Sequence, residues 1–406
     1  MSVLNVAQVL GYLASRFGGP PECAKHYGAK MTKMGLEVSY WATGNHTDRN
    51  ELSYLGKAAH IFDPSWPHGW FRSRELGPSL ESEIGSIDLL HLHEIWTYPL
   101  YVSARLARKH GKPYLIAPHG IFTVAWRYNT LKKKLYRRLV ANPMIKGATC
   151  FQALTAAEIH GIRESGYRGA ITVVPGGVHP EEFLDLPPRQ EAEQKWPVLK
   201  GKRVVHFLSR LSREKGLDQL IPAWADVVRG ESYADCVLVL SGPDHQGYGF
   251  VVEGLIKSHN LDIQVLLPGM VSGRDKAALI SRSDIYVLPS YSEGFSVSVL
   301  ENLAARKPVL ITPGCNFPEV VDAGAGLCVP PQRDLLAQGL RQLLDMSDSD
   351  REQMGRRGRD LVMNNYTWEM AARKLITVYN CILTGKEIPL FPEPIELDAN
   401  GKPLLT

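Results

Sequence analysis

Two glutamates, Glu293 and Glu301, lie eight positions apart in the segment LPSYSEGFSVSVLEN (288–302). The apolar stretch at 284–288 predicts a buried strand, the polar residues after it predict a loop, and those that follow predict a helix. A helix that begins at the carboxyl end of a strand favours an anion, because its first amide N–H groups are unpaired. Gly294 would let the backbone approach such a ligand closely. We expect Glu293 in the loop and Glu301 on the helix.

A second polar loop, in the segment FLSRLSREKG (207–216), also follows a predicted strand and precedes a predicted helix. Arg210 and Lys215 would project from this loop, and a planar guanidinium beside a flexible ammonium group suits a diphosphate. We expect Arg213 and Glu214 to be solvated. Taken alone, such a segment is more often a charged surface loop before a helix than a binding site.

Two short motifs in the first half of the chain add weaker signals. Gly18 and Gly19 allow a tight turn with exposed amides, but their segment lacks the G-x-G-x-x-G spacing of dinucleotide-binding dehydrogenases. His119 ends another predicted strand and would point from its carboxyl end. His91 and His93 share one face of a third strand, but no further ligand is evident beside them, so we expect no metal site.

Short apolar strands alternate with amphipathic helices along most of the chain, and these elements must position the polar motifs. The alternation predicts a doubly wound α/β fold with parallel sheets, whose ligands bind at the carboxyl ends of the strands. Expected strands cover residues 4–10, 36–41, 88–93, 113–118, 149–154, 171–174, 203–208, 236–241, 263–267, 284–288 and 308–312. Expected helices cover residues 99–110, 156–165, 217–228, 250–259, 274–281, 297–305, 334–344, 351–364 and 368–382.

The chain has 406 residues, which is more than one hydrophobic core usually serves, so two domains are expected. The strand pattern stops near residue 174 and restarts near residue 203. We expect an N-terminal domain over 1–185, a linker over 186–200, a C-terminal domain over 201–365, a helix over 366–385 that returns to the N-terminal domain, and an extended tail over 386–406.

Composition limits the class of protein. With 44% hydrophobic and 22% charged residues the chain is globular, and six scattered cysteines without a Cys-x-x-Cys pair suit a reducing cytosol. The N-terminus lacks the basic region of a signal peptide, and no apolar run approaches the ~18 residues of a membrane span. Residues 1–186 contain 21 Lys and Arg against 15 Asp and Glu, whereas the rest contain 25 against 27. The basic first half suits an anionic partner, such as a phosphate or a lipid surface.

Together these segments resemble the retaining glycosyltransferases of family GT4, which have the GT-B fold of two Rossmann-like domains. The resemblance rests on SRLSREKGLD, on PSYSEGFSVSVLEN with its E-x7-E pair, and on KPVLIT followed by FPEVV, in that order. It extends over nearly the whole chain, from Gly18 to the motif YTWE at 366–369. It implies a hexosyltransferase that takes a sugar from a UDP-sugar or GDP-sugar, with retention of configuration and without a metal or another cofactor. No nucleic-acid partner is implied.

The resemblance also implies roles for individual positions. Arg210 and Lys215 would neutralise the donor diphosphate, Glu301 would bind the ribose, and Glu293 would face the donor sugar. The other implied donor contacts are the amides of Gly294, Phe295 and Ser296, the glycine loop at Gly18 and Gly19, the side chain of His119 beside the sugar, and the backbone of residues 268–271, ending at Val271, beside the base. Helix N-termini and two cations can stabilise a leaving diphosphate without a metal, which agrees with these roles.

Two positions depart from the family pattern, and two other functions stay open. The segment VPGGVH (174–179) has Gly176 and His179 where the family has Asn and Asp, and Phe317 stands where a small residue is usual. These departures concern the identity of the donor or acceptor more than the reaction. The alternatives are a nucleotide-sugar binder without activity and a GT-B epimerase, which would need acid–base carboxylates in the first half, where Glu94 is the candidate.

A basic segment, LKKKLYRRLV (131–140), places five Lys and Arg residues in one predicted helix with leucines along one side. The leucines could pack on the sheet and leave a solvated basic face. Alternatively, the helix contacts an anionic leaflet, where each cation contributes up to ~1 kcal/mol. We therefore expect a cytoplasmic protein, able to bind the inner face of the membrane peripherally, whose acceptor is a saccharide or a lipid-linked saccharide in surface polysaccharide biosynthesis.

Overall fold

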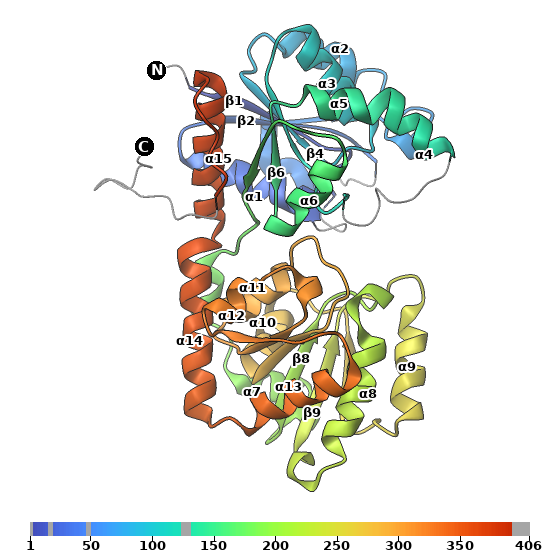
Figure 1. Ribbon diagram of the computed structural model, residues 1–406, viewed down its shortest axis with the longest axis vertical. Helices are drawn as coiled ribbons and strands as arrows, with labels where there is room; N and C mark the ends of the chain where they lie inside the picture. The colour runs from blue at the N-terminus through green and yellow to red at the C-terminus, as the bar shows by residue number, and fades with distance from the viewer. Residues whose placement is uncertain (1–2, 15–18, 46–49, 123–130, 392–406) are drawn as a thin grey trace, which may run out of the picture. The chain divides into compact units, whose positions relative to one another are not determined.

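The computed structural model describes residues 3–14, 19–45, 50–122 and 131–391. It divides into two compact units, Met1–Gly176 together with Trp368–Thr406, and Gly177–Thr367 (Figure 1). Each unit contains one sheet in which all the strand pairs are parallel, so the predicted α/β class with two doubly wound sheets is confirmed.

The sheet of the first unit has seven strands, and their order runs outward in both directions from β1 and β4. Their order is β3 (Ala59–Phe62), β2 (Glu37–Thr43), β1 (Asn5–Val9), β4 (Leu89–His93), β5 (Tyr114–Ala117), β6 (Cys150–Ala153) and β7 (Ala170–Val173). The order changes direction between β1 and β4, which is the position where ligands bind in open α/β sheets. Polar side chains at the carboxyl ends of these two strands are therefore candidates for function.

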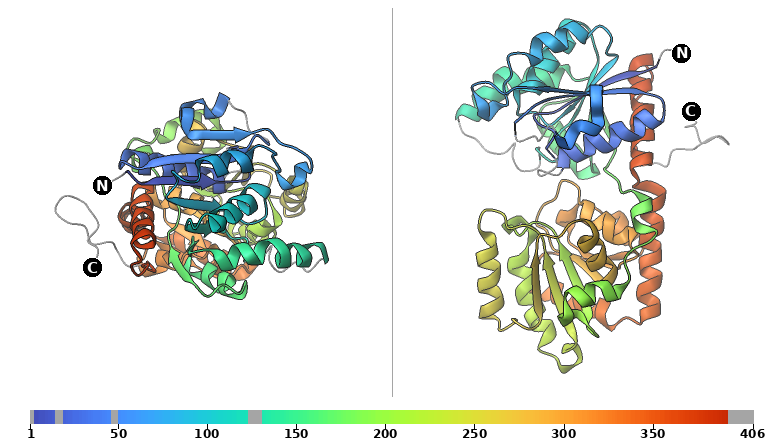
Figure 2. Two further views of the ribbon diagram at one scale, coloured as in Figure 1. Left: turned by 90° about the horizontal axis from the view of Figure 1, so that it is seen from above. Right: turned by 180° about the vertical axis from the view of Figure 1, so that it is seen from behind.

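Alternating residues of these strands face two helical layers. Val6 and Leu89 lie in one hydrophobic cluster with α1 (Gly19–Lys33) and α15 (Trp368–Thr384). Ala7 and Leu90 lie in another with α2 (Leu76–Glu83), α3 (Tyr98–Lys109) and α5 (Asn142–Gly147). Both faces are covered, which explains why these strands are apolar runs rather than alternating ones. Figures 1 and 2 show α15, at the red end of the colour scale, alongside this sheet.

The described part of the first unit also contains three shorter helical segments besides its 3-10 turns. They are α4 (Leu131–Tyr136), the π-helix η5 (Arg137–Ala141), which continues α4 into α5, and α6 (Ala156–Glu164). The predicted basic helix is therefore present, with a π-turn in its second half. Residues 392–406 of the expected tail lie outside the described residues.

The second unit has a six-stranded parallel sheet. Its order is β10 (Val265–Gly269), β9 (Cys236–Ser241), β8 (Arg203–Leu208), β11 (Ile285–Leu288), β12 (Val309–Ile311) and β13 (Gly326–Cys328). Its helices are α7 (Arg189–Lys195), α8 (Leu217–Val228), α9 (Tyr248–Ser258), α10 (Gly273–Arg282), α11 (Val297–Ala304), α12 (Glu319–Asp322), α13 (Arg333–Asp345) and α14 (Asp348–Asn365). Here the direction changes between β8 and β11, the strands that precede the two polar loops.

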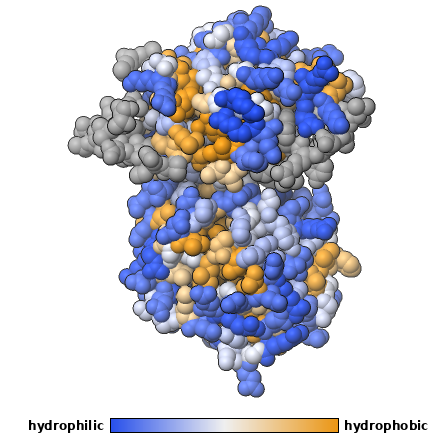
Figure 3. All heavy atoms as spheres, in the orientation of Figure 1, coloured by the Kyte–Doolittle hydropathy of each residue, from blue (hydrophilic) through white to orange (hydrophobic). Residues whose placement is uncertain are grey.

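The core of this unit also has two sides. Val205 and Phe207 of β8 lie in a large cluster with α8 and α13, while Val204 lies in a smaller one with α7 and α10. Over the face drawn in Figure 3, apolar side chains form small patches between polar ones. Among the described residues of the chain, no helix is both long enough and apolar enough to cross a membrane.

Candidate active site

Two loops of the second unit meet at the carboxyl edge of its sheet. The Nζ atom of Lys215 lies 2.6 Å from Oε1 of Glu293, and each side chain is only 10% exposed. The same carboxylate oxygen accepts a hydrogen bond from Ser290 Oγ at 2.5 Å. The backbones are joined as well, since the amide of Tyr291 donates to the carbonyl of Glu214 at 2.8 Å. Lys215, which was predicted to bind the diphosphate, and Glu293, which was predicted to face the sugar, thus form one ion pair that is held in place.

Glycine at position 216 makes this junction possible. Gly216 follows the 3-10 turn η8 (Arg213–Lys215) with φ of 69°, in the left-handed region that glycine adopts without strain. A Cβ atom at this position would lie 2.1 Å from the carbonyl oxygen of Pro289. Any other residue would therefore push the loop of Lys215 away from that of Glu293.

The loop of Glu293 is also tied to the segment after β12. The backbone amide of Glu293 donates to the carbonyl of Gly314 at 2.8 Å, and the backbone carbonyl of Glu293 accepts from Asn316 Nδ2 at 2.7 Å. A Cβ on Gly314 would lie within 2.6 Å of the backbone of Ser290 and Tyr291. The carboxylate is consequently held from the backbone side as well as through Lys215, as a preorganised site requires.

Arg210 lies in the same loop as Lys215 but is exposed to solvent, as is Arg213. Leu211, next to Arg210, is buried and bridges to Asp244 through its backbone. The guanidinium of Arg210 is therefore carried by an anchored backbone and exposed to solvent, which suits a cation that contacts an anionic ligand.

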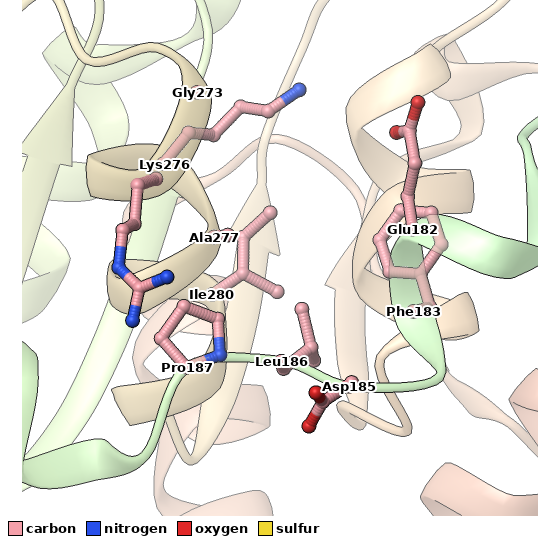
Figure 4. A pocket seen from close by; sticks show the side chains of 10 residues that line it. Glu182, Phe183, Asp185, Leu186, Pro187, Gly273, Lys276, Ala277 and Ile280 are labelled. Atoms are coloured by element: carbon pink, nitrogen blue, oxygen red, sulfur yellow. The ribbon is translucent and has the colours of Figure 1, made fainter.

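Glu301 lies on α11 and is bound to a partner that the sequence did not suggest. Lys276 Nζ, from the first turn of α10, lies 2.7 Å from Glu301 Oε1. Lys276 also lines a hollow of about 520 Å³ between α10 and the segment after Val178. Phe183 and Ile280 give this hollow an apolar floor, and Figure 4 shows Lys276 extending from α10 at its side. The predicted ribose ligand is thus paired, and a donor hydroxyl would have to share it with the lysine.

The start of α11 has the arrangement expected of an anion site. Ser296 occupies the N-cap position without a side-chain capping bond and is buried, while Gly294 and Phe295 precede it in the turn. The Phe295 ring lies 6.1 Å from that of Phe317, whose ring lies 5.0 Å from that of Tyr366. Phe317, the departure from the family pattern, is 5% exposed and belongs to this aromatic support of the turn.

The segment predicted to read the base spans the end of β10 and the loop after it. Val271 is partly buried and packs against both hydrophobic clusters of the unit. Met270, before it, is 72% exposed. The pairing of β10 with β9 shifts register between Leu266 and Gly269, so the strand ends in an irregularity.

In the first unit, His119 follows β5 in a left-handed turn with φ of 52°, and Gly120 continues that turn. The carboxylate of Glu158 accepts hydrogen bonds from two backbone amides at this turn. Gly120 N donates to Glu158 Oε1, and Leu154 N donates to Glu158 Oε2 at 2.8 Å. Glu158 is 1% exposed. Its burial raises its pKa, and the two amide bonds oppose that shift.

His119 also contacts His93, a buried residue of the neighbouring strand β4, which in turn contacts Gln8 on β1. Its Nε2 lies 2.9 Å from Nδ1 of His93, whose Nε2 lies 2.7 Å from Oε1 of Gln8. Burial lowers the pKa of His119 to about 3 and that of His93 well below its usual range, so both imidazoles are neutral at pH 7. Among the described residues, no group of three His, Cys, Asp or Glu side chains has a geometry for a metal ion.

Glu94 follows β4 and also has positive φ, of 77°. Burial raises the pKa of Glu94 to about 7, and burial together with the nearby Glu94 carboxylate raises the pKa of Tyr12 to about 12. Gly19 begins α1 with φ of 43°, whereas Gly18 lies outside the described residues. The glycine loop that the sequence predicted is therefore described only from its second glycine.

The structure brings Lys215 and Glu293 into direct contact, and leaves Glu301 in a separate pair with Lys276. Sequence reasoning missed Lys276, Ser290, Gln8, His93 as a partner of His119, and Glu158. A partial signal existed for Glu158, because Thr155-Ala-Ala-Glu158 has the spacing of a helix capping box, although its carboxylate accepts from the amide of Leu154 rather than from that of Thr155. The other contacts depend on which strands are neighbours, which the local sequence does not specify.

The two halves of this chain match two protein families of glycosyltransferases. Glycosyl transferases group 1 matches residues 188–361, and the glycosyl transferase 4-like domain matches residues 18–177. An uncharacterised glycosyltransferase of Methanocaldococcus jannaschii is 24% identical over 365 residues, which span 86% of this chain and 90% of that protein.

Solved structures share the fold at lower identity. A glycosyltransferase from Rickettsia africae has a TM-score of 0.77 at 18% identity, over 95% of this chain and all of that one. Anabaena HepE, crystallised with UDP and glucose, has a TM-score of 0.72 at 18% identity, over 92% of this chain and 98% of that one. The predicted GT-B fold is confirmed by these likenesses.

Proposed function

We propose a retaining hexosyltransferase, because the chain belongs to the glycosyl transferases group 1 family, with a GT4-like first half, and is therefore a glycosyltransferase that uses a nucleotide sugar. It transfers a hexose from a UDP-sugar or GDP-sugar to a saccharide or lipid-linked saccharide, with retention of configuration and without a metal. The observation that carries this proposal is the contact between Lys215 and Glu293 at 2.6 Å. One group suits the donor's phosphate and the other its sugar.

The chain's groups suit a reaction in which charge separates. As the bond between the anomeric carbon and the diphosphate oxygen breaks, negative charge develops on the diphosphate, where Lys215, Arg210 and the start of α11 can stabilise it. Positive charge develops at the anomeric carbon, where Glu293 can stabilise it. The acceptor oxygen then bonds to that carbon from the same face, and its proton passes to the departing phosphate oxygen.

The basic segment of the first unit supports an acceptor at an anionic lipid surface. Residues 95–157 contain eleven Lys and Arg and no Asp or Glu. Leu135 and Leu139 are 58% and 61% exposed, so the alternative in which these leucines pack on the sheet is wrong for both. Exposed leucines beside cations are typical of segments that lie in a membrane interface. The side chains of Leu131, Lys132 and Lys133 lie outside the described residues.

The test is a product analysis with intact protein. UDP-sugars and GDP-sugars are offered with and without saccharide acceptors, while the release of nucleoside diphosphate and the anomeric configuration of the product are followed by proton NMR. We expect acceptor-dependent release and a product with the donor's configuration. An inverted product would contradict retention, release with an epimerised free sugar would favour the epimerase, and binding without turnover would favour an inactive binder.

A further inference from the structure

Two buried side chains, Gln8 and His93, and the half-buried His119 form a hydrogen-bonded series across neighbouring strands of the first sheet. Gln8 Oε1 on β1 lies 2.7 Å from Nε2 of His93 on β4, and Nδ1 of His93 lies 2.9 Å from Nε2 of His119, beyond β5. Gln8 is fully buried and His93 is 1% exposed. The series therefore begins inside the sheet and ends at its carboxyl edge, where His119 lies.

The series has a direction that Gln8 sets. A neutral imidazole carries one N–H, and the burial described above keeps both histidines neutral. The amide oxygen of Gln8 can only accept, so the proton of His93 is on Nε2 and its Nδ1 accepts. His119 must then donate from Nε2, which leaves a lone pair on its Nδ1.

The Nδ1 atom of His119 is buried, and among the described residues it has no hydrogen-bond partner. A buried acceptor without a donor is costly, and such groups in native structures often belong to a ligand site. The ring is nevertheless held firmly, through Nε2 by His93 and through its strained turn by Glu158. The structure thus keeps an unsatisfied acceptor in place.

His91 forms a separate branch of this cluster. Its ring stacks on that of His93 at 4.3 Å, and its Nδ1 lies 2.8 Å from the hydroxyl of Tyr379 on α15. The hydroxyl of Tyr379 pairs with Nδ1 of His91, and Nε2 of His91 is buried without a hydrogen-bond partner among the described residues, so this branch occupies neither nitrogen of His93. Only Gln8 and His119 contact the nitrogens of that ring among the hydrogen bonds described here.

We propose that Gln8 and His93 are positioning residues that hold His119 as its Nε2–H tautomer, so that Nδ1 accepts a hydrogen bond from a hydroxyl group of the bound sugar. This inference rests on the proposed function. It also makes the series a determinant of specificity, because a sugar that lacks the matching hydroxyl leaves Nδ1 unpaired in the complex. Donors that are deoxygenated at that position would be poor substrates.

The first test is spectroscopic and needs no substrate. In protein labelled with ¹⁵N-histidine, protonated and unprotonated ring nitrogens have separate shifts, and H93N and H119N variants assign the signals. We expect the proton on Nε2 in both His93 and His119. Gln8→Leu removes the acceptor and should convert His119 to a mixture of tautomers, while buried His206, whose Nε2 contacts Ser241 Oγ at 2.6 Å in the other unit, stays unchanged. Thr172→Val, which removes another buried oxygen from the same sheet, is the matched control.

The second test is kinetic. Gln8→Leu should lower kcat by about 3- to 10-fold, as expected for one neutral hydrogen bond, without weakening the binding of UDP or GDP, whereas Thr172→Val should change neither. A proton on Nδ1 of His119 in the unaltered protein would overturn the proposal even if transfer is normal. Normal tautomers without any transfer would instead contradict the proposed function. An unchanged kcat and unchanged tautomers in folded Gln8→Leu would show that Gln8 does not position the series.

Discussion

Lys215 Nζ and Glu293 Oε1 lie 2.6 Å apart, although 78 positions separate the two residues in the sequence. The loops that follow two neighbouring strands, β8 and β11, bring them together. Each group neutralises the other while the site has no donor, and each would face a charged part of the donor during transfer. The pair therefore keeps two reactive charges in place at low cost.

Removing one member of this pair should destabilise the protein as well as inactivate it. Lys215→Met leaves the Glu293 carboxylate buried without its cation, which typically costs about 3–5 kcal/mol. The double variant Lys215→Met, Glu293→Gln should recover most of that stability and none of the activity. Urea unfolding and a transfer assay measure the two effects. Equal stability of the single and double variants would show that the ion pair does not hold the loops together.

The two glutamates should differ in kinetics. Glu301 is expected to bind the ribose, and this interaction is the same in the ground and transition states. Glu301→Gln should therefore mainly raise KM, by a factor that corresponds to a loss of roughly 1.5–3 kcal/mol in donor binding. Glu293→Gln should mainly lower kcat, because its charge matters as the oxocarbenium centre develops. Lys276→Met frees Glu301 and serves as a companion variant. A reversed pattern would mean that the assigned roles are exchanged.

Membrane contact should depend on the exposed face of the basic segment. Lys134, Leu135, Arg138 and Leu139 are exposed there. Replacing Leu135 and Leu139 by Ser should reduce co-sedimentation with anionic vesicles at low salt, as should replacing Lys134 and Arg138 by Gln. Leu383→Ser, a change at an exposed leucine of α15, is the control. If neutral and anionic vesicles recover equal amounts of protein, the acceptor is not presented by such a surface.

Stability should fall with rising pH because of Glu94. Burial raises its folded-state pKa from 4.5 to about 7, so between these values the folded protein retains a proton that the unfolded chain has lost. The resulting loss in the free energy of unfolding is absent below pH 4.5 and complete above pH 7, where it reaches about 3 kcal/mol. Glu94→Gln should therefore stabilise the protein at pH 8 and scarcely at pH 4, whereas exposed Glu37→Gln should do neither. A stabilisation that is independent of pH would contradict the buried carboxyl.

Hydrophobic patterning was sufficient to predict most of the elements, and some of the missing ones have an identifiable physical reason. The strands β3 and β13 lie at sheet edges and have only four and three residues, too few for a recognisable period. The segment expected as a linker contains α7, which packs its buried Ala192 against α10. A short polar helix with one buried alanine gives no periodic signal, since its stability comes from that contact.

The candidate site could be predicted only where a motif placed its residues next to each other in sequence. The loops of Arg210, Lys215, Glu293 and Glu301 were found in this way, and the structure places all four on loops or helices at the carboxyl edge of the second sheet. The partners of these residues come from elsewhere in the fold. Lys276 reaches Glu301 from α10, and its role follows from packing rather than from any local pattern.

The second unit is proposed to bind the diphosphate of a nucleotide sugar. Thermal unfolding, measured by differential scanning with UDP, GDP, ADP and dTDP, tests this proposal most directly. At a concentration 100 times Kd, a nucleotide that binds only the folded state stabilises it by about 2.7 kcal/mol. We predict that at least one of the four raises Tm, that Arg210→Ala abolishes the rise, and that Arg213→Ala, an equally exposed change in the same loop, preserves it. If none of the four raises Tm, or if Arg210→Ala and Arg213→Ala respond alike to the nucleotide, the assignment of this site is contradicted.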